Sequence, residues 1–187
     1  HYTSILDEHR AVRQAAGLFD VSHMGQIALT GQGAVATGDR LLTRAVSPMR
    51  PGRVRYALLC NDAGGVVDDV TVYRLAEGAF FLCVNAANVE KDYRWIVRHA
   101  APDAEVRNTS EETGLLALQG PASAAILRPL CDRPVEKLAR YAFDRVVLAG
   151  CTALVSRTGY TGSAGFEIYG GVGDLVRVFA ALLAAGK

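Results

Sequence analysis

The chain has 187 residues, a formal net charge of +1 at pH 7, 50% hydrophobic residues and 21% charged residues. This composition is ordinary for a globular protein and allows one large domain or two small ones. The near-neutral charge gives no electrostatic reason to expect binding to nucleic acid or to an anionic membrane, and no apolar run approaches the roughly 20 residues of a membrane span.

The first half of the chain predicts a mixture of helices and strands. A helix begins at Thr3 or Ser4, where Asp7 stands in the position of a capping partner, and Gly17 is a suitable stop for it. The pattern of apolar residues over 18–30 predicts one strand. The remaining elements of this half are, in chain order, a helix over 31–44, strands over 56–60, 66–74 and 79–84, a helix over 86–100 and a short strand over 103–107.

The second half of the chain repeats this plan. Residues 116–123 align with residues 27–34, and both segments predict a strand that turns at a glycine into a helix. A hairpin over 143–157, a strand over 166–169 and a helix over about 174–185 then follow. Each half therefore has the order β-α-β-β-β-α, although the identity between the halves is weak enough for chance to be the alternative.

The duplication predicts an α+β fold built from two related units. We expect residues 1–108 to form the first unit and residues 109–187 the second. A cleft between duplicated halves is a common place for a ligand to bind.

Four cysteines lie far apart in the chain and form no C-x-x-C pair: Cys60, Cys83, Cys131 and Cys151. This spacing favours free thiols in a reducing compartment, the cytoplasm, over disulfides or a metal site. No H-E-x-x-H motif or cluster of cysteines and histidines indicates a metal, and no signal peptide is evident. Because the chain starts at His1 without a methionine and ends in an apolar, helix-like stretch, we expect it to be a piece of something longer.

The strand over 66–73 carries two adjacent carboxylates in the middle of an otherwise sheet-forming sequence. Side chains alternate between the faces of a strand, which places Asp68 with the valines and Asp69 with Thr71 and Tyr73. A buried charge is costly unless it is paired. A row made of a carboxylate, a hydroxyl and a phenol therefore indicates a binding or catalytic site rather than a packed surface.

Neighbouring residues extend this candidate site and leave alternatives open. Tyr56 and Tyr73 are candidates to stack on a planar heterocycle, or they are ordinary sheet aromatics. Asp69 is a site residue, or it pairs with an arginine such as Arg74. Asn85 ends a strand and is placed to read the polar edge of a ligand, although either Asn85 or its neighbour Asn88 is also placed to cap the following helix.

Two further segments carry unusual residues. Residues 17–25 hold Ser22, His23 and Met24, but neighbouring strand residues point to opposite faces, and the absence of a G-x-S-x-G elbow argues against a hydrolase triad. Met24 belongs to the core or to the wall of a pocket for an aromatic ligand. The glycine-rich run over 156–165 predicts a strained loop or a close backbone approach, and Glu167 follows it as an isolated carboxylate inside a strand.

Taken together, these segments resemble the aminomethyltransferase family, the T-protein of the glycine cleavage system. The resemblance covers essentially the whole chain and depends on the ordered set of Tyr2–Ile5, Gly17–Gly25, Gly64–Asp69, Val84–Asn88, Leu118–Pro121 and Arg157–Gly162. It implies binding of tetrahydrofolate, which in this family takes a methylene group from the aminomethyl arm of the lipoylated H-protein. Ammonia, methylenetetrahydrofolate and the dihydrolipoyl protein are the products.

The resemblance also implies roles for individual residues. Asp69 matches the catalytic aspartate of the family, which orients folate and raises the nucleophilicity of its nitrogen. Glu167 would accept hydrogen bonds from the donor edge of the pterin. The residues that match positions lining the pterin pocket are Met24, Tyr56, Thr71, Tyr73, Asn85, Tyr160 and Glu167.

The chain departs from the family pattern in two places. Ser163 and Ala164 stand where many relatives have an acidic pair, which puts the charge of that loop in question. Relatives also continue past Lys187 into a Gly-Leu-Gly-Ala-Arg-Asp type motif and a C-terminal β-barrel that supply part of the cleft. We therefore expect this chain by itself to bind folate poorly or to be inactive.

Two other members of the broader family remain as alternatives. One is a folate-dependent demethylase or the folate module of an enzyme that oxidises dimethylglycine or sarcosine. The other is a non-enzymatic folate-binding protein of the tRNA-modification and iron–sulfur type, which carries a Lys-Gly-Cys-Tyr-x-Gly-Gln-Glu segment. The corresponding stretch here, Arg157–Gly162, has no cysteine, which disfavours the second alternative.

Overall fold

The computed structural model describes residues 2–187. The chain divides into two compact units. We call residues 23–111 the middle unit, and the segment up to Ser22 together with Glu112–Lys187 the outer unit. No helix of residues 2–187 is long and apolar enough to cross a bilayer.

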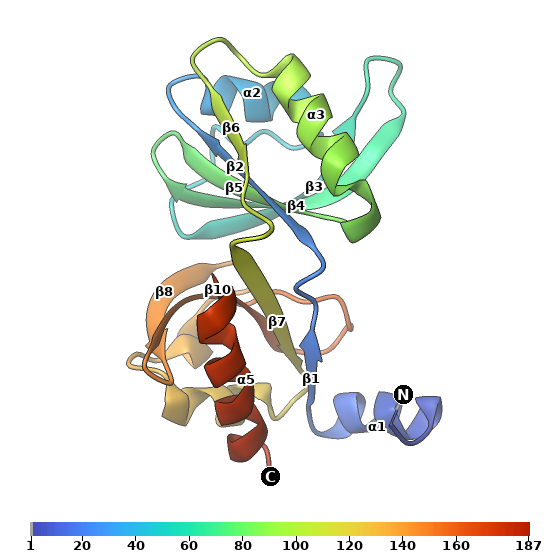
Figure 1. The fold of residues 1–187 in the computed structure, drawn as a ribbon, viewed down its shortest axis with the longest axis vertical. Helices are drawn as coiled ribbons and strands as arrows, with labels where there is room; N and C mark the ends of the chain where they lie inside the picture. The colour runs from blue at the N-terminus through green and yellow to red at the C-terminus, as the bar shows by residue number, and fades with distance from the viewer. Residues whose placement is uncertain (1) are drawn as a thin grey trace. The chain divides into compact units, whose positions relative to one another are not determined.

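The middle unit is an antiparallel five-stranded sheet with the strand order β3-β4-β5-β2-β6 and two helices on one face (Figure 1). Its elements are β2 (Gly25–Thr30), α2 (Ala34–Leu41), β3 (Arg53–Cys60), β4 (Val66–Ala76), β5 (Ala79–Val84), the 3₁₀ turn η1 (Ala86–Asn88), α3 (Val89–His99) and β6 (Glu105–Asn108). Ile96 of α3 and Leu41 of α2 belong to the same buried cluster as Val70 and Val72 of β4. The helices therefore cover the apolar face of β4.

The outer unit has a second antiparallel five-stranded sheet, with the order β1-β7-β10-β9-β8. Its elements are α1 (Ile5–Gln14), β1 (Gly17–Asp20), β7 (Thr113–Gln119), α4 (Ser123–Leu127), the 3₁₀ turns η2 (Arg128–Leu130) and η3 (Val135–Lys137), β8 (Phe143–Leu148), β9 (Cys151–Ser156), β10 (Gly165–Gly171) and α5 (Val172–Ala185). Leu175, Val178 and Leu182 of α5 pack with Phe166 and Ile168 of β10 in its core. Ser4 caps α1 as predicted, because its Oγ accepts a hydrogen bond of 3.1 Å from the Asp7 amide.

The predicted α+β class and the duplicated order are confirmed. The segment from β2 through β5 to α3 has the order β-α-β-β-β-α, and the segment from β7 through β10 to α5 repeats it. The turn of the second hairpin lies at Ala149 and Gly150, whose φ angles of 49° and 78° are both positive. Positive φ at both central residues is the geometry of a tight two-residue hairpin.

The prediction of a single strand over 18–30 is wrong. The chain leaves β1 after Asp20 and begins β2 at Gly25, and the two strands belong to different sheets. β1 pairs with β7, with Leu18 opposite Leu118. An apolar pattern identifies strand-forming residues but not their partners. Consequently the predicted unit 1–108 differs from the structure, in which the residues up to Ser22 belong with the second half.

Candidate functional site

Side chains of β4 alternate between a buried apolar face and a more exposed polar face, as predicted from the sequence. Val70 and Val72 are 2% and 1% exposed on the helix-covered face, whereas Asp69 is exposed and Thr71 half-buried on the other face. The register places Tyr56 of β3 directly opposite Thr71. Opposed residues of an antiparallel pair share a face, so Tyr56, Asp69 and Thr71 lie on one side of the sheet.

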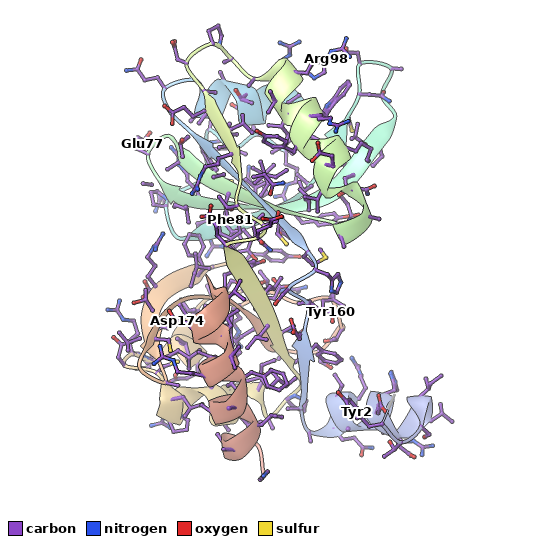
Figure 2. All side chains as sticks on the ribbon, viewed as in Figure 1. Tyr2, Glu77, Phe81, Arg98, Tyr160 and Asp174 are labelled. Carbon is purple, nitrogen blue, oxygen red and sulfur yellow. The ribbon has the colours of Figure 1, made fainter. Side chains whose placement is uncertain are left out.

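The two tyrosines predicted to stack on a ligand have different surroundings. Tyr73 is fully buried and stacks on Phe81 of β5, with ring centroids 4.1 Å apart and planes 9° from parallel; Phe81 is labelled in Figure 2. Tyr56 is 43% exposed. One face of the Tyr73 ring is therefore used within the sheet, while Tyr56 presents ring surface to solvent.

Asp69 interacts with Asn85 rather than with Arg74. The Asn85 side-chain amide donates to Asp69 Oδ1 at 3.0 Å and to the Asp69 carbonyl at 3.2 Å. Arg74 is buried and donates to the carbonyl of Ser47 at 3.0 Å and to the Glu77 carboxylate at 3.0 Å. The predicted alternative of an Asp69–Arg74 salt bridge is therefore wrong, because the arginine is used to hold a loop and a turn.

The two asparagines after β5 do not cap a helix through their side chains. Asn85 Nδ2 donates to Asp68 Oδ1 at 2.9 Å, and its backbone amide donates to Asp68 Oδ2 at 3.0 Å. Asn88 Nδ2 donates to Asp68 Oδ1 at 2.8 Å. The capping alternative is thus wrong: both amides bind the carboxylate of Asp68 instead.

Asp92 is a site residue that the sequence analysis missed. It lies on α3, is fully buried and is placed next to Asp68. Burial, and then the hydrogen bond and negative charge of Asp68, raise the pKa of Asp92 to about 7. A signal for it was present, because Asp92 lies four positions before the buried Ile96 and so falls on the apolar stripe of the helix.

Asp68 has the opposite electrostatic balance. Burial opposes its ionisation, but hydrogen bonds from Asp92, Asn85 and Asn88 outweigh this effect and lower its pKa. A carboxylate that accepts several hydrogen bonds is stabilised in its charged form. Asp68 is therefore the ionised member of the pair and Asp92 the member that holds a proton up to near neutral pH.

The segment before β2 does not form a catalytic triad. The Ser22 hydroxyl accepts a hydrogen bond from the Leu115 amide at 3.1 Å, and His23 is exposed. Met24 is half-buried and immediately precedes Gly25, where an added Cβ would come within 2.5 Å of a Val89 methyl. The tight packing at Gly25 fixes the point at which the chain enters the sheet beside Met24.

The remaining predicted residues, Tyr160 and Glu167, lie in the outer unit. The Thr158 hydroxyl donates to Glu167 Oε2, and the ring of Tyr160 contacts Phe19 edge-on at 6.3 Å. Tyr160, labelled in Figure 2, is 62% exposed. Partial burial, followed by the negative charge of Glu167, raises the pKa of its phenol, so Tyr160 and Glu167 are electrostatic neighbours.

The glycine-rich loop after β9 approaches a buried side chain closely, as predicted. A Cβ at Gly159 or Gly165 would come within 2.0 or 2.5 Å of the Gln119 side chain. Gln119 Nε2 in turn donates to the Thr158 carbonyl at 3.2 Å. The glycines therefore allow the loop to lie against Gln119, which fixes the position of the segment between Thr158 and Glu167.

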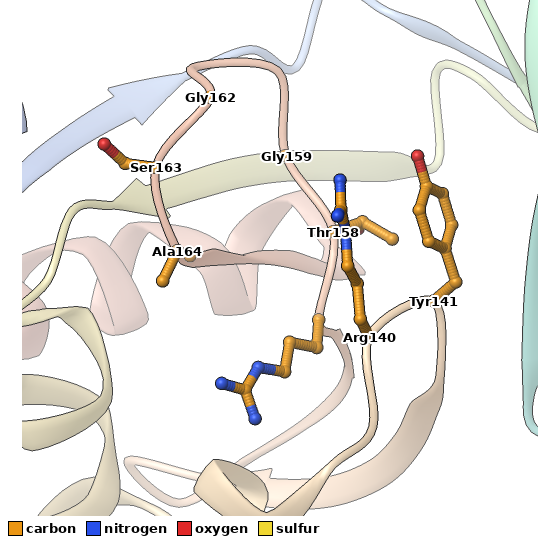
Figure 3. Close-up of a pocket in the computed structure, with 9 residues that line it drawn as sticks. Arg140, Tyr141, Thr158, Gly159, Gly162, Ser163 and Ala164 are labelled. Atoms are coloured by element: carbon orange, nitrogen blue, oxygen red, sulfur yellow. The ribbon is translucent and has the colours of Figure 1, made fainter.

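An open cavity of about 490 Å³ lies beneath this loop (Figure 3). Its lining residues are Arg140, Tyr141, Arg157, Thr158, Gly159, Gly162, Ser163, Ala164 and Gly165. Arg157 Nη1 donates to the carbonyls of Glu136 and Leu138 at 3.1 and 2.9 Å, which ties one of its two arginines to the wall. Neither Tyr160 nor Glu167 is among the lining residues, so this cavity is distinct from the predicted pterin-binding positions of the outer unit.

Fold and residues together define a class: a duplicated α+β domain whose sheets carry hydrogen-bonded carboxylates. The chain belongs to the GCVT N-terminal domain family, whose model matches residues 1–187. It is 48% identical over 186 residues to the aminomethyltransferase of Geobacillus kaustophilus (strain HTA426), covering 99% of this chain and 51% of that protein. It is 44% identical to the aminomethyltransferase of Bacillus subtilis (strain 168), again over 99% of this chain and 51% of the relative.

The chain is also similar in fold to two solved structures. The chain superimposes on the glycine cleavage system aminomethyltransferase T from Bartonella henselae with a TM-score of 0.88 and 34% identity, covering 96% of this chain and 48% of that one. A chain of the heterotetrameric sarcosine oxidase from Corynebacterium sp. U-96 gives a TM-score of 0.68 at 20% identity, over 96% of this chain and 89% of that one, a likeness of fold alone. The chain thus spans about half the length of the aminomethyltransferases that it matches.

Proposed function

We propose that this chain is the folate-binding region of an aminomethyltransferase. The reaction would transfer the methylene group of an aminomethyl-lipoyl H-protein to tetrahydrofolate, with release of ammonia and formation of the dihydrolipoyl protein. Membership of the family and the names of the relatives support this proposal. The sarcosine- or dimethylglycine-oxidising alternative is supported only by a likeness of fold, and the curated relatives named above are all aminomethyltransferases.

The observation that carries the proposal is the exposed carboxylate of Asp69, held by the Asn85 amide on the polar face of β4. A carboxylate fixed beside an amine nucleophile accepts its proton or stabilises the positive charge that develops on nitrogen as the new C–N bond forms. Thr71 and Tyr56 lie on the same face, and Tyr56 offers an aromatic surface for a flat ring. This set of groups suits a planar heterocycle with a reactive amine.

The chemistry of the other predicted residues fits tetrahydrofolate as the second substrate. The pterin edge presents N–H donors, and Glu167 is an acceptor held in place by the Thr158 hydroxyl. We assign Met24, Tyr56, Thr71, Tyr73, Asn85, Tyr160 and Glu167 to folate binding and Asp69 to catalysis. We further propose the lipoylated H-protein as the protein partner and the cytoplasm as the location.

The test uses the full-length protein with aminomethyl-loaded H-protein and tetrahydrofolate, and it measures methylenetetrahydrofolate formation. We expect Asp69→Asn and Asp69→Ala to lower kcat by roughly 100- to 10,000-fold, the range of a lost general base. Asp62→Asn is the matched control, since Asp62 is an exposed acid in the turn that precedes the same strand. Full activity in both Asp69 variants would refute the catalytic assignment.

Calorimetry with tetrahydrofolate on this chain and on the full-length protein tests the binding proposal directly. We expect tight binding only by the longer protein, because the chain spans about half of its relatives. Absence of binding by the full-length protein would contradict the assignment of folate.

A further inference from the structure

The middle unit contains a chain of hydrogen bonds that runs from the buried face of its sheet to the exposed carboxylate of Asp69. It begins at Asp92 on α3, passes through Asp68 on β4, and reaches Asp69 through the amide of Asn85. The reaction proposed above requires only the last member. The two buried acids behind it, Asp68 and Asp92, are therefore without a role in that proposal.

Asp68 and Asp69 are held by one nitrogen atom. Asn85 Nδ2 lies 2.9 Å from Asp68 Oδ1 and 3.0 Å from Asp69 Oδ1, so its two hydrogens serve both carboxylates. The Asn85 backbone amide also donates to Asp68, at 3.0 Å. Any shift of the Asp68 carboxylate is thus transmitted to the amide that orients Asp69.

Asp68 is also held by a second asparagine, Asn88 of η1. Asn88 Nδ2 donates to Asp68 Oδ1 at 2.8 Å, and Asp68 is only 5% exposed. Two donors from Asn85, which links β5 to η1, and one from Asn88 of η1 therefore converge on a buried carboxylate next to Asp92. Two buried carboxyl groups side by side cannot both be ionised without a large electrostatic cost.

A shared proton resolves this conflict. Neither oxygen of Asp92 accepts a hydrogen bond from a donor within residues 2–187, although Lys91 Nζ lies 3.3 Å from Oδ1 with half of its side chain exposed. A protonated Asp92 needs no such donor, because its O–H itself donates to Asp68. The charged groups that act on Asp92 are Asp68 from β4 and Lys91 from its own helix.

We propose that Asp68 is a positioning residue, which fixes the catalytic carboxylate of Asp69 through Asn85 and is itself held by a hydrogen bond from the buried carboxyl of Asp92. The inference rests on the proposed function for the role of Asp69, but the network itself is independent of it. Loss of the proton from Asp92 places two negative charges side by side, weakens the hold on Asp68 and loosens Asn85. The network therefore couples the geometry of Asp69 to pH near neutrality.

The first test needs no turnover. In the full-length protein labelled with ¹⁵N at asparagine, the side-chain amide signals of Asn85 and Asn88 are followed from pH 5.5 to 8.5. We expect both signals to titrate with one common midpoint near pH 7, the pKa of Asp92, and to stop titrating in Asp92→Asn. Signals that do not move, or that move equally in Asp92→Asn, would overturn the proposal.

The second test separates positioning from general stability. We expect Asp68→Asn to lower kcat by roughly 10- to 100-fold, the cost of a misplaced catalytic group, with the KM for tetrahydrofolate changed less than about threefold and the fold retained by circular dichroism. Asp92→Asn keeps a donor toward Asp68 but does not titrate, so the pH profile of kcat should be flatter than in the wild type. Glu90→Gln, an exposed acid on the same helix that pairs with Arg94, is the matched control.

The outcomes distinguish this inference from the proposed function. A wild-type kcat in Asp68→Asn alongside an impaired Asp69→Asn would overturn positioning and leave the proposed function intact. Full activity of Asp69→Asn would refute the catalytic assignment, while the amide titration still decides whether the network exists. If Asp68→Asn does not fold, Asn88→Ala takes its place, because it removes one donor to Asp68. An unchanged kcat in Asn88→Ala, together with wild-type asparagine amide signals that do not titrate, would refute the proposal.

Discussion

The two sheets have equivalent strand orders but satisfy their carboxylates in different ways. In the middle unit the acids stand on β4, next to the edge strand β3, and are held by asparagine amides. The corresponding strand of the outer unit, β9, reads Cys-Thr-Ala-Leu-Val-Ser and carries no acid. There the acid is Glu167, one strand further in on β10, and a threonine hydroxyl holds it.

The difference shows that topology does not decide where chemistry is placed. Both units supply an interior strand next to the edge strand of the sheet, yet only β4 carries acids. The side-chain nitrogen of an asparagine only donates and does not titrate, so the direction of its hydrogen bonds to the carboxylates of the middle unit is fixed. A hydroxyl rotates and both donates and accepts, so Glu167 retains more freedom, which suits binding better than proton transfer.

The sharpest way to break this comparison is to neutralise one carboxylate from each unit. Asp69→Asn should reduce kcat by roughly 100-fold or more, whereas Glu167→Gln should raise the KM for tetrahydrofolate by roughly 10- to 100-fold, the cost of one charged hydrogen bond. Steady-state kinetics of both variants in the full-length protein provides the measurement. Equal effects on kcat in the two variants would contradict the division of roles.

Replacing the buried acid of the middle unit should change stability with pH. Between its ordinary value near 4 and the raised pKa of about 7, Asp92 binds more proton in the folded state than in the unfolded state. Its contribution therefore falls as pH rises through this window and stays low above pH 7. Relative to the wild type, Asp92→Asn should gain about 4 kcal/mol in the free energy of unfolding when the pH rises from 4 to 8.

Urea unfolding of both proteins at several pH values measures this effect. Glu90→Gln serves as the control, since Glu90 is exposed on the same helix. The same pH dependence in wild type and Asp92→Asn would show that Asp92 ionises normally in the folded protein.

A smaller effect is expected from removing the Thr158 hydroxyl, which donates a hydrogen bond to Glu167 in the outer unit. Thr158→Val removes the donor to Glu167 and keeps the shape of the side chain. We expect an increase in the KM for tetrahydrofolate of about tenfold, equivalent to one lost hydrogen bond to a charged group. Thr152→Val is the control, because Thr152 is exposed on β9; an equal rise in KM in both variants would argue against a specific role for Thr158.

The smallest effect concerns the phenol of Tyr160. Partial burial and the charge of Glu167 hold its pKa above the ordinary value of 10.0. Removing the charge in Glu167→Gln should lower that pKa, because phenolate then forms without a negative neighbour, while burial keeps part of the shift. Absorbance titrations of the wild type and of Glu167→Gln, each compared with the same protein carrying Tyr160→Phe, isolate the ionisation of the Tyr160 phenol. An unchanged midpoint in Glu167→Gln would mean that Tyr160 and Glu167 do not interact.

Much of this architecture follows from the sequence because its signals are local. Alternation along β4 predicts which acid is buried and which is exposed, and the glycine-rich run predicts the close approach to Gln119. Pairing of distant groups is not local. The sequence does not reveal that Asn85 and Asn88 bind Asp68, since a cap and a cross-element hydrogen bond use the same residue type in the same place.

The same limit explains the error at residues 18–30. Both β1 and β2 have strand-forming composition, and the interruption between them, residues 21–24, contains neither proline nor glycine. Whether a strand continues or changes sheets depends on partners almost 100 residues away, such as β7 for β1. Asp92 was missed for a related reason, because its burial depends on the sheet packed against its helix.

The exchange of strands at the start of the chain has a consequence for biosynthesis. β1 is made early but pairs with β7, which ends at Gln119. At roughly 5 to 20 residues per second, its partner is synthesised about 5 to 20 seconds later. During that interval the middle unit is translated as one continuous segment and has all of its own strands. The nascent chain therefore completes the sheet of the outer unit around a strand that was made before any strand of the middle unit.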